Sequence, residues 1–348
     1  MKQLTYFEER DLKNRNKIEE ILSFLPDYFY GYAISLESRG LSSLSRLNYL
    51  VDLKVFIEWL SDSSGILVKD IDIRLLEGLK PIDFQSFISE QASGRIALID
   101  GKEKLLKSGL KAQARKLSAI KSFYKYLFNN DLINSNVTTK VEAPRIIEDN
   151  HKIKRLYVDE IDPMLSAVDF NNLDSHQKAY LKNTAERDNA IISLLLGTGI
   201  RVSELVGLDI NDFDFKHKNF KVTRKGGKVE LLYFADDLQD ILEIWLNKRA
   251  TLQIDKNENA MFISLQNRRM SVSSVEKMIK KYSASVGKEI SPHKLRATYG
   301  TELYKATGDI YDVATALGHR DINTTKKHYA DYDEDKKQKI AGKVRVEH

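Results

Sequence analysis

The side chains best suited to chemistry lie in the second half of the chain. Arg201 ends the run Gly-Thr-Gly-Ile-Arg, and Arg296 stands three residues after His293. An arginine presents two parallel N–H donors to a phosphate, which a lysine cannot do. Two arginines that converge on one phosphate would offset the charge of its non-bridging oxygens, which is the main demand that phosphoryl transfer makes on a protein. The pattern therefore predicts a pocket for a phosphodiester anion.

A nucleophile for such a phosphate is found further along the chain. His319 ends a Leu-Gly-His segment, and Tyr329 follows it ten residues later. A free phenol has a pKa of about 10, so it attacks only where neighbouring cations or a histidine base help it to ionise. Its position relative to His319 favours Tyr329 over Tyr311 and Tyr332 as the attacking residue.

A proton donor is predicted between two short strands. Lys225 opens the sequence Lys-Gly-Gly-Lys, which is typical of a hairpin turn. An ammonium group at the tip of that hairpin could protonate a leaving oxygen. Lys228, at the other end of the same turn, is an alternative for this role.

Purely structural roles are also open to these residues. Arg201 could be a surface arginine paired with Glu204, which lies one helical turn further on and could orient Arg201 or cap the helix. His293 could cap the helix that Pro292 is expected to open, and Arg296 could be a solvated residue of that helix. The order of the segments along the chain, rather than any one of them, favours the chemical interpretation.

In this order the segments resemble those of the tyrosine recombinase family, of the phage-integrase and Xer type. The matching pieces are Gly197 to Leu205, the hairpin lysine, His293-Lys294-Leu295-Arg296, Leu317-Gly318-His319 and Tyr329. The resemblance covers roughly residues 155–335. The basic N-terminal half is similar, less specifically, to the core-binding domain of that family.

The resemblance implies a role for each matching residue. Arg201 and Arg296 would hold the scissile phosphate, and His319 would add a further donor. Lys225 would be the general acid for the 5′-oxygen. His293 would be the general base or a hydrogen-bond partner at the phosphate.

The resemblance also implies a reaction and its partners. Tyr329 would be the nucleophile, giving a 3′-phosphotyrosyl intermediate, and strands would be exchanged through a Holliday junction. The partners would be double-stranded DNA with a specific target site, a homotetramer on that DNA, and either an accessory DNA-bending protein or a second recombinase. No cofactor is expected, because the seven histidines lack metal-ligand spacing and no ATP-binding loop is found in the sequence.

Two departures from the family pattern and two competing functions stay open. In many members the tyrosine stands where this chain has His328, and a histidine stands where it has Ala297. A type IB topoisomerase would use similar chemistry without exchanging partners. An architectural DNA-binding protein could keep the fold without the reaction.

Length and composition limit the number of domains and the class of protein. The chain has 348 residues, a formal net charge of +5 and no cysteine. This length predicts about two domains, and the absence of cysteine excludes disulfides and thiolate sites. The sequence begins without the apolar stretch of a signal peptide, and no run approaches the roughly 18 apolar residues that span a membrane. We therefore expect no membrane partner and a cytoplasmic, nucleoid-associated protein.

Positive charge is concentrated in the N-terminal half. Residues 102–125 hold eight basic side chains against one acidic side chain, Glu103. Such a bias favours a helix face that meets phosphates over an ordinary solvated face. The candidate DNA contacts are Lys107, Lys111, Arg115, Lys116 and Lys121.

The element pattern predicts a mainly α protein with a small antiparallel β-sheet, arranged as a two-domain DNA clamp. Apolar residues recur at helical spacing over 49–60 and 117–127, and the first ~140 residues are expected to be helical. The predicted domains are a helical core-binding domain over 1–142, a linker over 143–157, and an α+β catalytic domain over 158–348 with a C-terminal tail from about 330.

Overall fold

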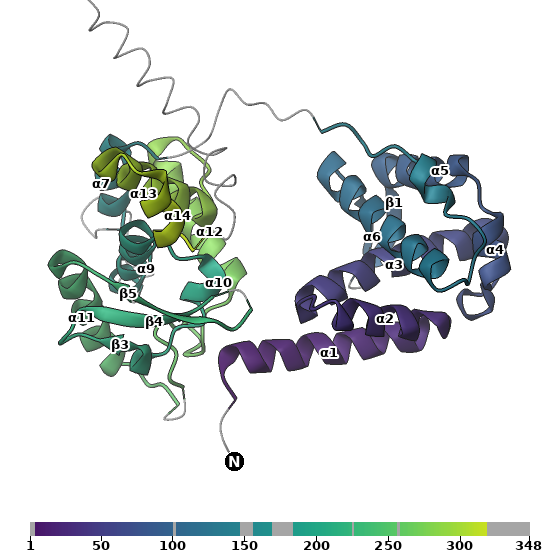
Figure 1. The fold of residues 1–348 in the computed structure, drawn as a ribbon. Helices are drawn as coiled ribbons and strands as arrows, with labels where there is room; N and C mark the ends of the chain where they lie inside the picture. The colour runs from purple at the N-terminus through teal and green to yellow at the C-terminus, as the bar shows by residue number, and fades with distance from the viewer. Residues whose placement is uncertain are drawn as a thin grey trace, which may run out of the picture. The chain divides into compact units, whose positions relative to one another are not determined.

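The computed structural model describes residues 4–99, 102–146, 156–168, 184–224, 226–255 and 258–318 (Figure 1). The chain divides into two compact units, Met1–Asp149 and Asn150–His348. The described elements are mostly helices, with one two-stranded and one three-stranded antiparallel sheet. The predicted fold class, mainly α with a small antiparallel sheet, is confirmed. Most of the predicted linker and all of the predicted tail lie outside the described residues.

The first unit is a helical bundle around an aromatic core. Its helices are α1 (Tyr6–Phe24), α2 (Tyr28–Ser38), α3 (Ser43–Ser64), α4 (Ile73–Gly78), α5 (Pro81–Ser93) and α6 (Leu110–Asn129), with short 3₁₀ turns at Val68–Asp70 and Val137–Lys140. The rings of Phe29 and Phe123 stack with centroids 4.5 Å apart. Phe56 packs against Phe84 and Phe87, and all of these rings are buried.

The predicted helical stripes supply this core. In α3 the buried residues include Leu50, Leu53 and Phe56, and in α6 they include Leu117 and Ile120. Burying one face of each helix provides most of the stability that such helices have in a protein. The other face of each helix stays open to solvent or to a partner.

One prediction for this unit is wrong. Residues near 100 are not helical, because β1 (Arg95–Ile99) and β2 (Lys102–Leu106) pair as an antiparallel hairpin, with Arg95 opposite Leu106. The basic stretch 102–125 is therefore a strand followed by α6, rather than one helix face. The sequence carries a signal for this, since an Asp-Gly pair at 100–101 stands between two short apolar runs.

The second unit packs helices around a buried central helix. They are α7 (Val158–Ser166), α9 (Ala185–Thr198), α10 (Val202–Leu205), α11 (Asp236–Ala250), α12 (Val272–Ser283), α13 (Pro292–Thr307) and α14 (Ile310–Ala316). The core of α9 includes Ile191, Leu194 and Leu195, and α11 and α13 pack against it.

A three-stranded sheet completes the described part of this unit. Its strands are β3 (Phe213–Asp214), β4 (Asn219–Thr223) and β5 (Val229–Tyr233), in the order β3-β4-β5. Thr223 pairs with Val229, so the β4–β5 hairpin closes over residues 224–228, as the Lys-Gly-Gly-Lys sequence predicts.

Two glycine turns bring distant segments to the same place. Gly199 ends α9 in the left-handed conformation with φ 61°, and α10 starts three residues later. Gly318 follows α14 with φ 58°. A side chain is strained at such φ values, so glycine suits both positions.

Candidate active site

The site is built on the turn between α9 and α10. Arg201 precedes the first residue of α10, and its backbone N–H donates to Oε2 of Glu204 at 2.8 Å. Its Nη1 donates to Oε1 of the same carboxylate at 2.7 Å. Glu204 therefore both caps the helix and orients Arg201, as the sequence predicts. The side chain of Arg201 is 35% exposed, so part of its guanidinium stays open to a ligand.

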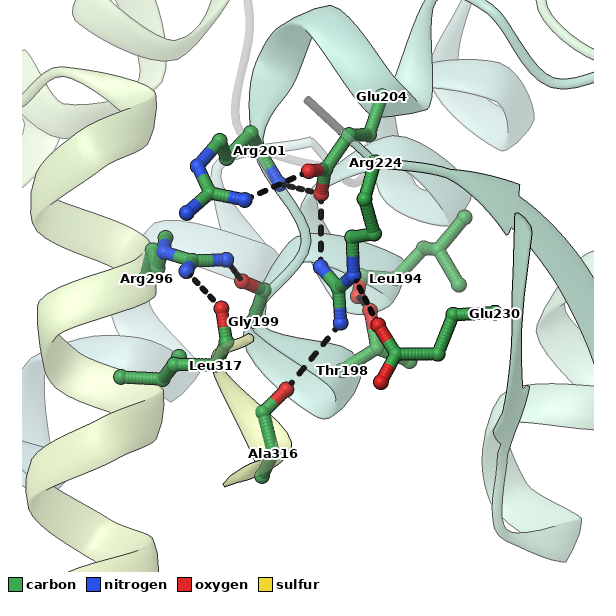
Figure 2. A network of polar contacts seen from close by, with 10 residues as sticks. All are labelled: Leu194, Thr198, Gly199, Arg201, Glu204, Arg224, Glu230, Arg296, Ala316 and Leu317. Atoms are coloured by element: carbon green, nitrogen blue, oxygen red, sulfur yellow. Dashed lines mark hydrogen bonds and ion pairs between the residues drawn. The ribbon is translucent and has the colours of Figure 1, made fainter. Parts of the chain in front are cut away.

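A second arginine shares the same carboxylate. Nη1 of Arg224 donates to Oε2 of Glu204 at 2.9 Å, and Nε donates to Oε2 of Glu230 at 2.6 Å (Figure 2). Nη2 donates to the carbonyl oxygen of Ala316 at 3.3 Å. Arg224 thus joins α10, β5 and the end of α14 through one buried guanidinium.

The third arginine reaches the same region from α13. Arg296 is buried, and its Nη1 donates to the carbonyl oxygen of Gly199 while Nη2 donates to that of Leu317 (Figure 2). Gly199 lies two residues before Arg201. Pro292 occupies the first turn of α13, as predicted, so Arg296 leaves from a helix whose start is fixed.

The described part of the cluster brings guanidinium groups and carboxylates together. Arg201 and Arg224 pair with the carboxylates of Glu204 and Glu230. The guanidinium of Arg296 donates to two backbone carbonyl oxygens, those of Gly199 and Leu317. Fixed guanidinium groups in a partly buried site attract anions more strongly than they would in water.

The ring of Tyr299 packs against the Gly199 turn. A Cβ at Gly199 would lie 2.3 Å from Cδ1 of Tyr299, so only glycine fits beneath this ring. Burial raises the pKa of the Tyr299 hydroxyl, although the charges of Arg224 and Arg296 lower it. A raised pKa is the opposite of what a nucleophilic phenol needs, so Tyr299 serves packing.

The structure describes three of the six predicted site residues. Arg201 and Arg296 come together around the Gly199 turn. His293 lies one turn before Arg296 on α13 and is exposed. Lys225, His319 and Tyr329 lie outside the described residues.

The residues that precede Lys225 and His319 in the sequence lie close together in the structure. Arg224 directly precedes Lys225, and Gly318 directly precedes His319. A Cβ at Gly318 would lie 3.3 Å from Nε of Arg224. The chain just before each of these two predicted groups is thus held at the side chain of Arg224.

Sequence reasoning missed Arg224 and Tyr299. Arg224 stands beside the predicted proton donor Lys225, and Tyr299 stands three residues after Arg296. Their roles follow from burial and from tertiary contacts, which spacing along the sequence does not reveal.

Comparison with known proteins shows the family to which the chain belongs. Residues 154–336 match the model of the phage integrase family. The chain belongs to the phage integrase family. Residues 30–130 match the N-terminal SAM-like domain of phage integrases.

Relatives of this integrase-family chain are named tyrosine recombinases. The chain is 35% identical over 338 residues to tyrosine recombinase XerS of Streptococcus uberis, with 89% of this chain and 93% of that protein covered. It is 32% identical over 332 residues to XerS of Streptococcus mutans, with the same coverage of 89% and 93%.

Solved structures share the fold of this integrase-family chain. One is the XerH site-specific recombinase bound to palindromic difH substrate in a post-cleavage complex, with a TM-score of 0.63 and 18% identity over 94% of this chain and 89% of that chain. Another is a lambda integrase dimer bound to a COC′ core site, with a TM-score of 0.58 and 15% identity over 89% of this chain and 79% of that chain.

The predicted DNA contacts of the N-terminal unit differ in exposure and in their protein partners. Lys107, Lys111 and Arg115 are exposed. Nη1 of Arg115 lies 2.8 Å from a carboxylate oxygen of the buried Asp52. Lys116 donates to the hydroxyl of Ser108 at 3.2 Å, and Lys121 donates to the carbonyl oxygen of Val141 at 2.6 Å.

A groove of about 530 Å³ lies beside α6 in this unit of the integrase-family chain. Its basic lining residues are Arg39, Lys121 and Lys125, and hydroxyl and amide side chains line the rest. Such a lining matches the donors that proteins use on nucleic-acid phosphates.

The described residues contain neither of two other kinds of feature. No group of three or more His, Asp or Glu side chains there could hold a metal ion. No helix among them is long and apolar enough to cross a membrane.

Proposed function

We propose that this chain recombines double-stranded DNA at a specific target site by cutting and rejoining strands through a 3′-phosphotyrosyl intermediate. The observation that carries this proposal is the convergence of Arg201 and Arg296 on the Gly199 turn, beside a third arginine, Arg224. Family membership supports the same reaction. Strands would be exchanged through a Holliday junction, without metal or ATP.

The proposed chemistry begins with attack by Tyr329 on the scissile phosphate. Its oxygen forms a bond to phosphorus, and the bond from phosphorus to the 5′-oxygen breaks. The phenolic proton passes to a base, for which His293 is the candidate, and Lys225 or Lys228 protonates the departing 5′-oxygen. One phosphodiester replaces another, so the 5′-hydroxyl of a partner duplex can reverse the step without fuel.

Each remaining residue has a place in this scheme. Arg201, with its partly exposed guanidinium, would bind a non-bridging oxygen directly. Arg296 would add charge from the buried side of the turn, and His319 would add a further donor. The electrostatic contribution of such groups is usually the largest in a reaction of this kind.

The partners proposed for this enzyme follow from the same reaction. Exchange between two duplexes requires four cleaving subunits, so a homotetramer on DNA is proposed, with either an accessory bending protein or a second recombinase. The N-terminal unit would hold the target duplex through Lys107, Lys111, Arg115, Lys116 and Lys121. The enzyme would act in the cytoplasm at the nucleoid, where double-stranded DNA is found.

A trapping experiment tests the proposal. The protein is mixed with a library of nicked duplexes of randomised sequence, in which cleavage releases a short downstream fragment that carries the free 5′-hydroxyl, and covalent adducts are separated on a denaturing gel. We expect wild type to form an adduct and Tyr329→Phe to form none while it still binds DNA. The matched control, Tyr332→Phe, should form the adduct.

Several outcomes would count against this scheme. An adduct at wild-type level in Tyr329→Phe would remove that residue from the nucleophile role, and His328 would be tested next. Binding without any adduct in wild type would favour an architectural DNA-binding protein. Relaxation of plasmids that lack a specific site would favour a type IB topoisomerase.

A further inference from the structure

Arg224 has three charged or polar partners in three different elements. Its guanidinium donates to Glu204 on α10, to Glu230 on β5 and to the carbonyl oxygen of Ala316, the last residue of α14 (Figure 2). The side chain is only 6% exposed. It is therefore committed to the protein interior rather than offered to DNA.

The backbone of Arg224 also closes the β4–β5 loop. Its N–H donates to the carbonyl oxygen of Lys228 at 2.7 Å, and its own carbonyl accepts from the N–H of Gly227 at 3.0 Å. Both lysines that are candidates for the proton donor belong to this loop. Any displacement of Arg224 is therefore passed to the base of the loop.

We propose that Arg224 is a positioning residue that fixes the proton-donating loop relative to the phosphate clamp. Through Glu204 it is tied to Arg201, and through Ala316 it is tied to the segment that leads to His319. One side chain thus sets the distance between the groups that bind the phosphate and the lysine that protonates the leaving 5′-oxygen. This inference rests on the proposed function.

The chemistry of arginine explains why this residue type is needed. A guanidinium is planar and has donors that point in fixed, separate directions, so it can hold three acceptors at once. A lysine ammonium keeps the charge but is a compact point on a flexible stem. Arg224→Lys should therefore preserve neutralisation of the carboxylates and lose the fixed geometry.

The test uses two versions of one suicide duplex, whose sequence is the one that wild type selects from the randomised library. In the first version the scissile phosphate carries the ordinary bridging 5′-oxygen, and in the second it carries a bridging 5′-sulfur. With sulfur, the bond from phosphorus to sulfur breaks and the thiolate leaves without needing a proton. The rate of adduct formation is measured on both.

We expect Arg224→Lys to cleave the oxygen duplex about 10²-fold more slowly than wild type, as misplacement of a catalytic group by about 1 Å can cause. On the sulfur duplex its rate should return to within a few-fold of wild type. Lys225→Ala and Lys228→Ala in the same assay identify the donor. Arg201→Ala should be slow on both duplexes, because binding of the phosphate does not depend on the leaving group.

A buried arginine elsewhere in the unit provides the matched control. Arg249 donates to the carbonyl oxygens of Ala260 and Glu258, which lie outside the arginine cluster. Arg249→Lys should lower stability without changing the ratio of the two rates. If Arg224→Lys does not fold, the double variant Arg224→Gln with Glu230→Gln removes the charge together with one counter-charge and takes its place.

The outcomes separate this inference from the proposed function. Wild-type rates for Arg224→Lys on the oxygen duplex, or equal losses on both duplexes, would overturn the positioning role while leaving the recombinase intact. No adduct from wild type on either duplex would overturn the proposed function itself.

Discussion

Replacing Glu204 by glutamine tests whether one carboxylate organises the arginine cluster. Glu204 is 3% exposed and accepts three hydrogen bonds, two from Arg201 and one from Arg224. A glutamine has one oxygen instead of two. If the amide oxygen takes the place of Oε2 and keeps its two partners, the amide NH₂ takes the place of Oε1. It then faces Nη1 of Arg201, so that two hydrogen-bond donors lie opposite each other.

The expected cost follows from these contacts. Glu204→Gln removes at least one charge-assisted hydrogen bond, worth about 1.5–3 kcal/mol, and leaves the buried guanidinium of Arg224 and the partly exposed guanidinium of Arg201 without their shared counter-charge. Breaking a buried pair in this way costs about 3–5 kcal/mol. Glu230→Gln is the comparison, because Glu230 is 28% exposed and has one contact with Arg224. Its expected cost is about 1 kcal/mol.

Tryptophan fluorescence during urea unfolding measures both variants. The chain has two tryptophans, with Trp59 in the first unit and the buried Trp245 in the second. In a Trp59→Phe background the signal therefore reports the second unit alone. Equal losses of less than about 1 kcal/mol in Glu204→Gln and Glu230→Gln would refute the central place given to Glu204.

Three further predictions concern cleavage, DNA affinity and pH. Arg296→Ala should slow cleavage at least about 10²-fold, or about 3 kcal/mol in barrier, and near-normal adduct formation would contradict its clamp role. Lys125→Ala should lower the slope of log affinity against log salt by about 1, whereas Lys54→Ala, whose ammonium lies 3.9 Å from the carboxylate of Glu58, should leave that slope unchanged; equal slopes for the two variants would contradict phosphate binding in the groove. Burial raises the pKa of Asp52, against the lowering effect of Arg115. Because the folded state then holds this proton more tightly than the unfolded state, wild type should lose stability relative to Asp52→Asn as pH rises through the raised pKa, and parallel stability curves would contradict this.

Local signals in the sequence predicted much of the second unit. The start of α13 at Pro292, the end of α9 near Gly199 and the cap formed by Glu204 on Arg201 depend on neighbours within a few residues. The periodicity of α6 also predicted which of its residues are buried. Such features follow from propensity and pattern, which are properties of short segments.

Features that depend on distant contacts were not predicted. The three partners of Arg224 come from segments up to 92 residues away along the chain, so no local pattern marks it. The β1–β2 hairpin was missed because the basic residues around it were interpreted as one helix face. In the N-terminal unit, the contact of Lys121 with Val141 gives it a structural partner that its charge alone did not indicate.

Mass spectrometry of the trapped adduct tests the central claim most directly. Wild-type protein is reacted with the suicide duplex, the DNA is digested to a short remnant, and the modified peptide is fragmented to locate the nucleotide. The account predicts a 3′-phosphonucleotide on the hydroxyl of Tyr329. A remnant on Tyr299, His328 or any other residue would contradict it.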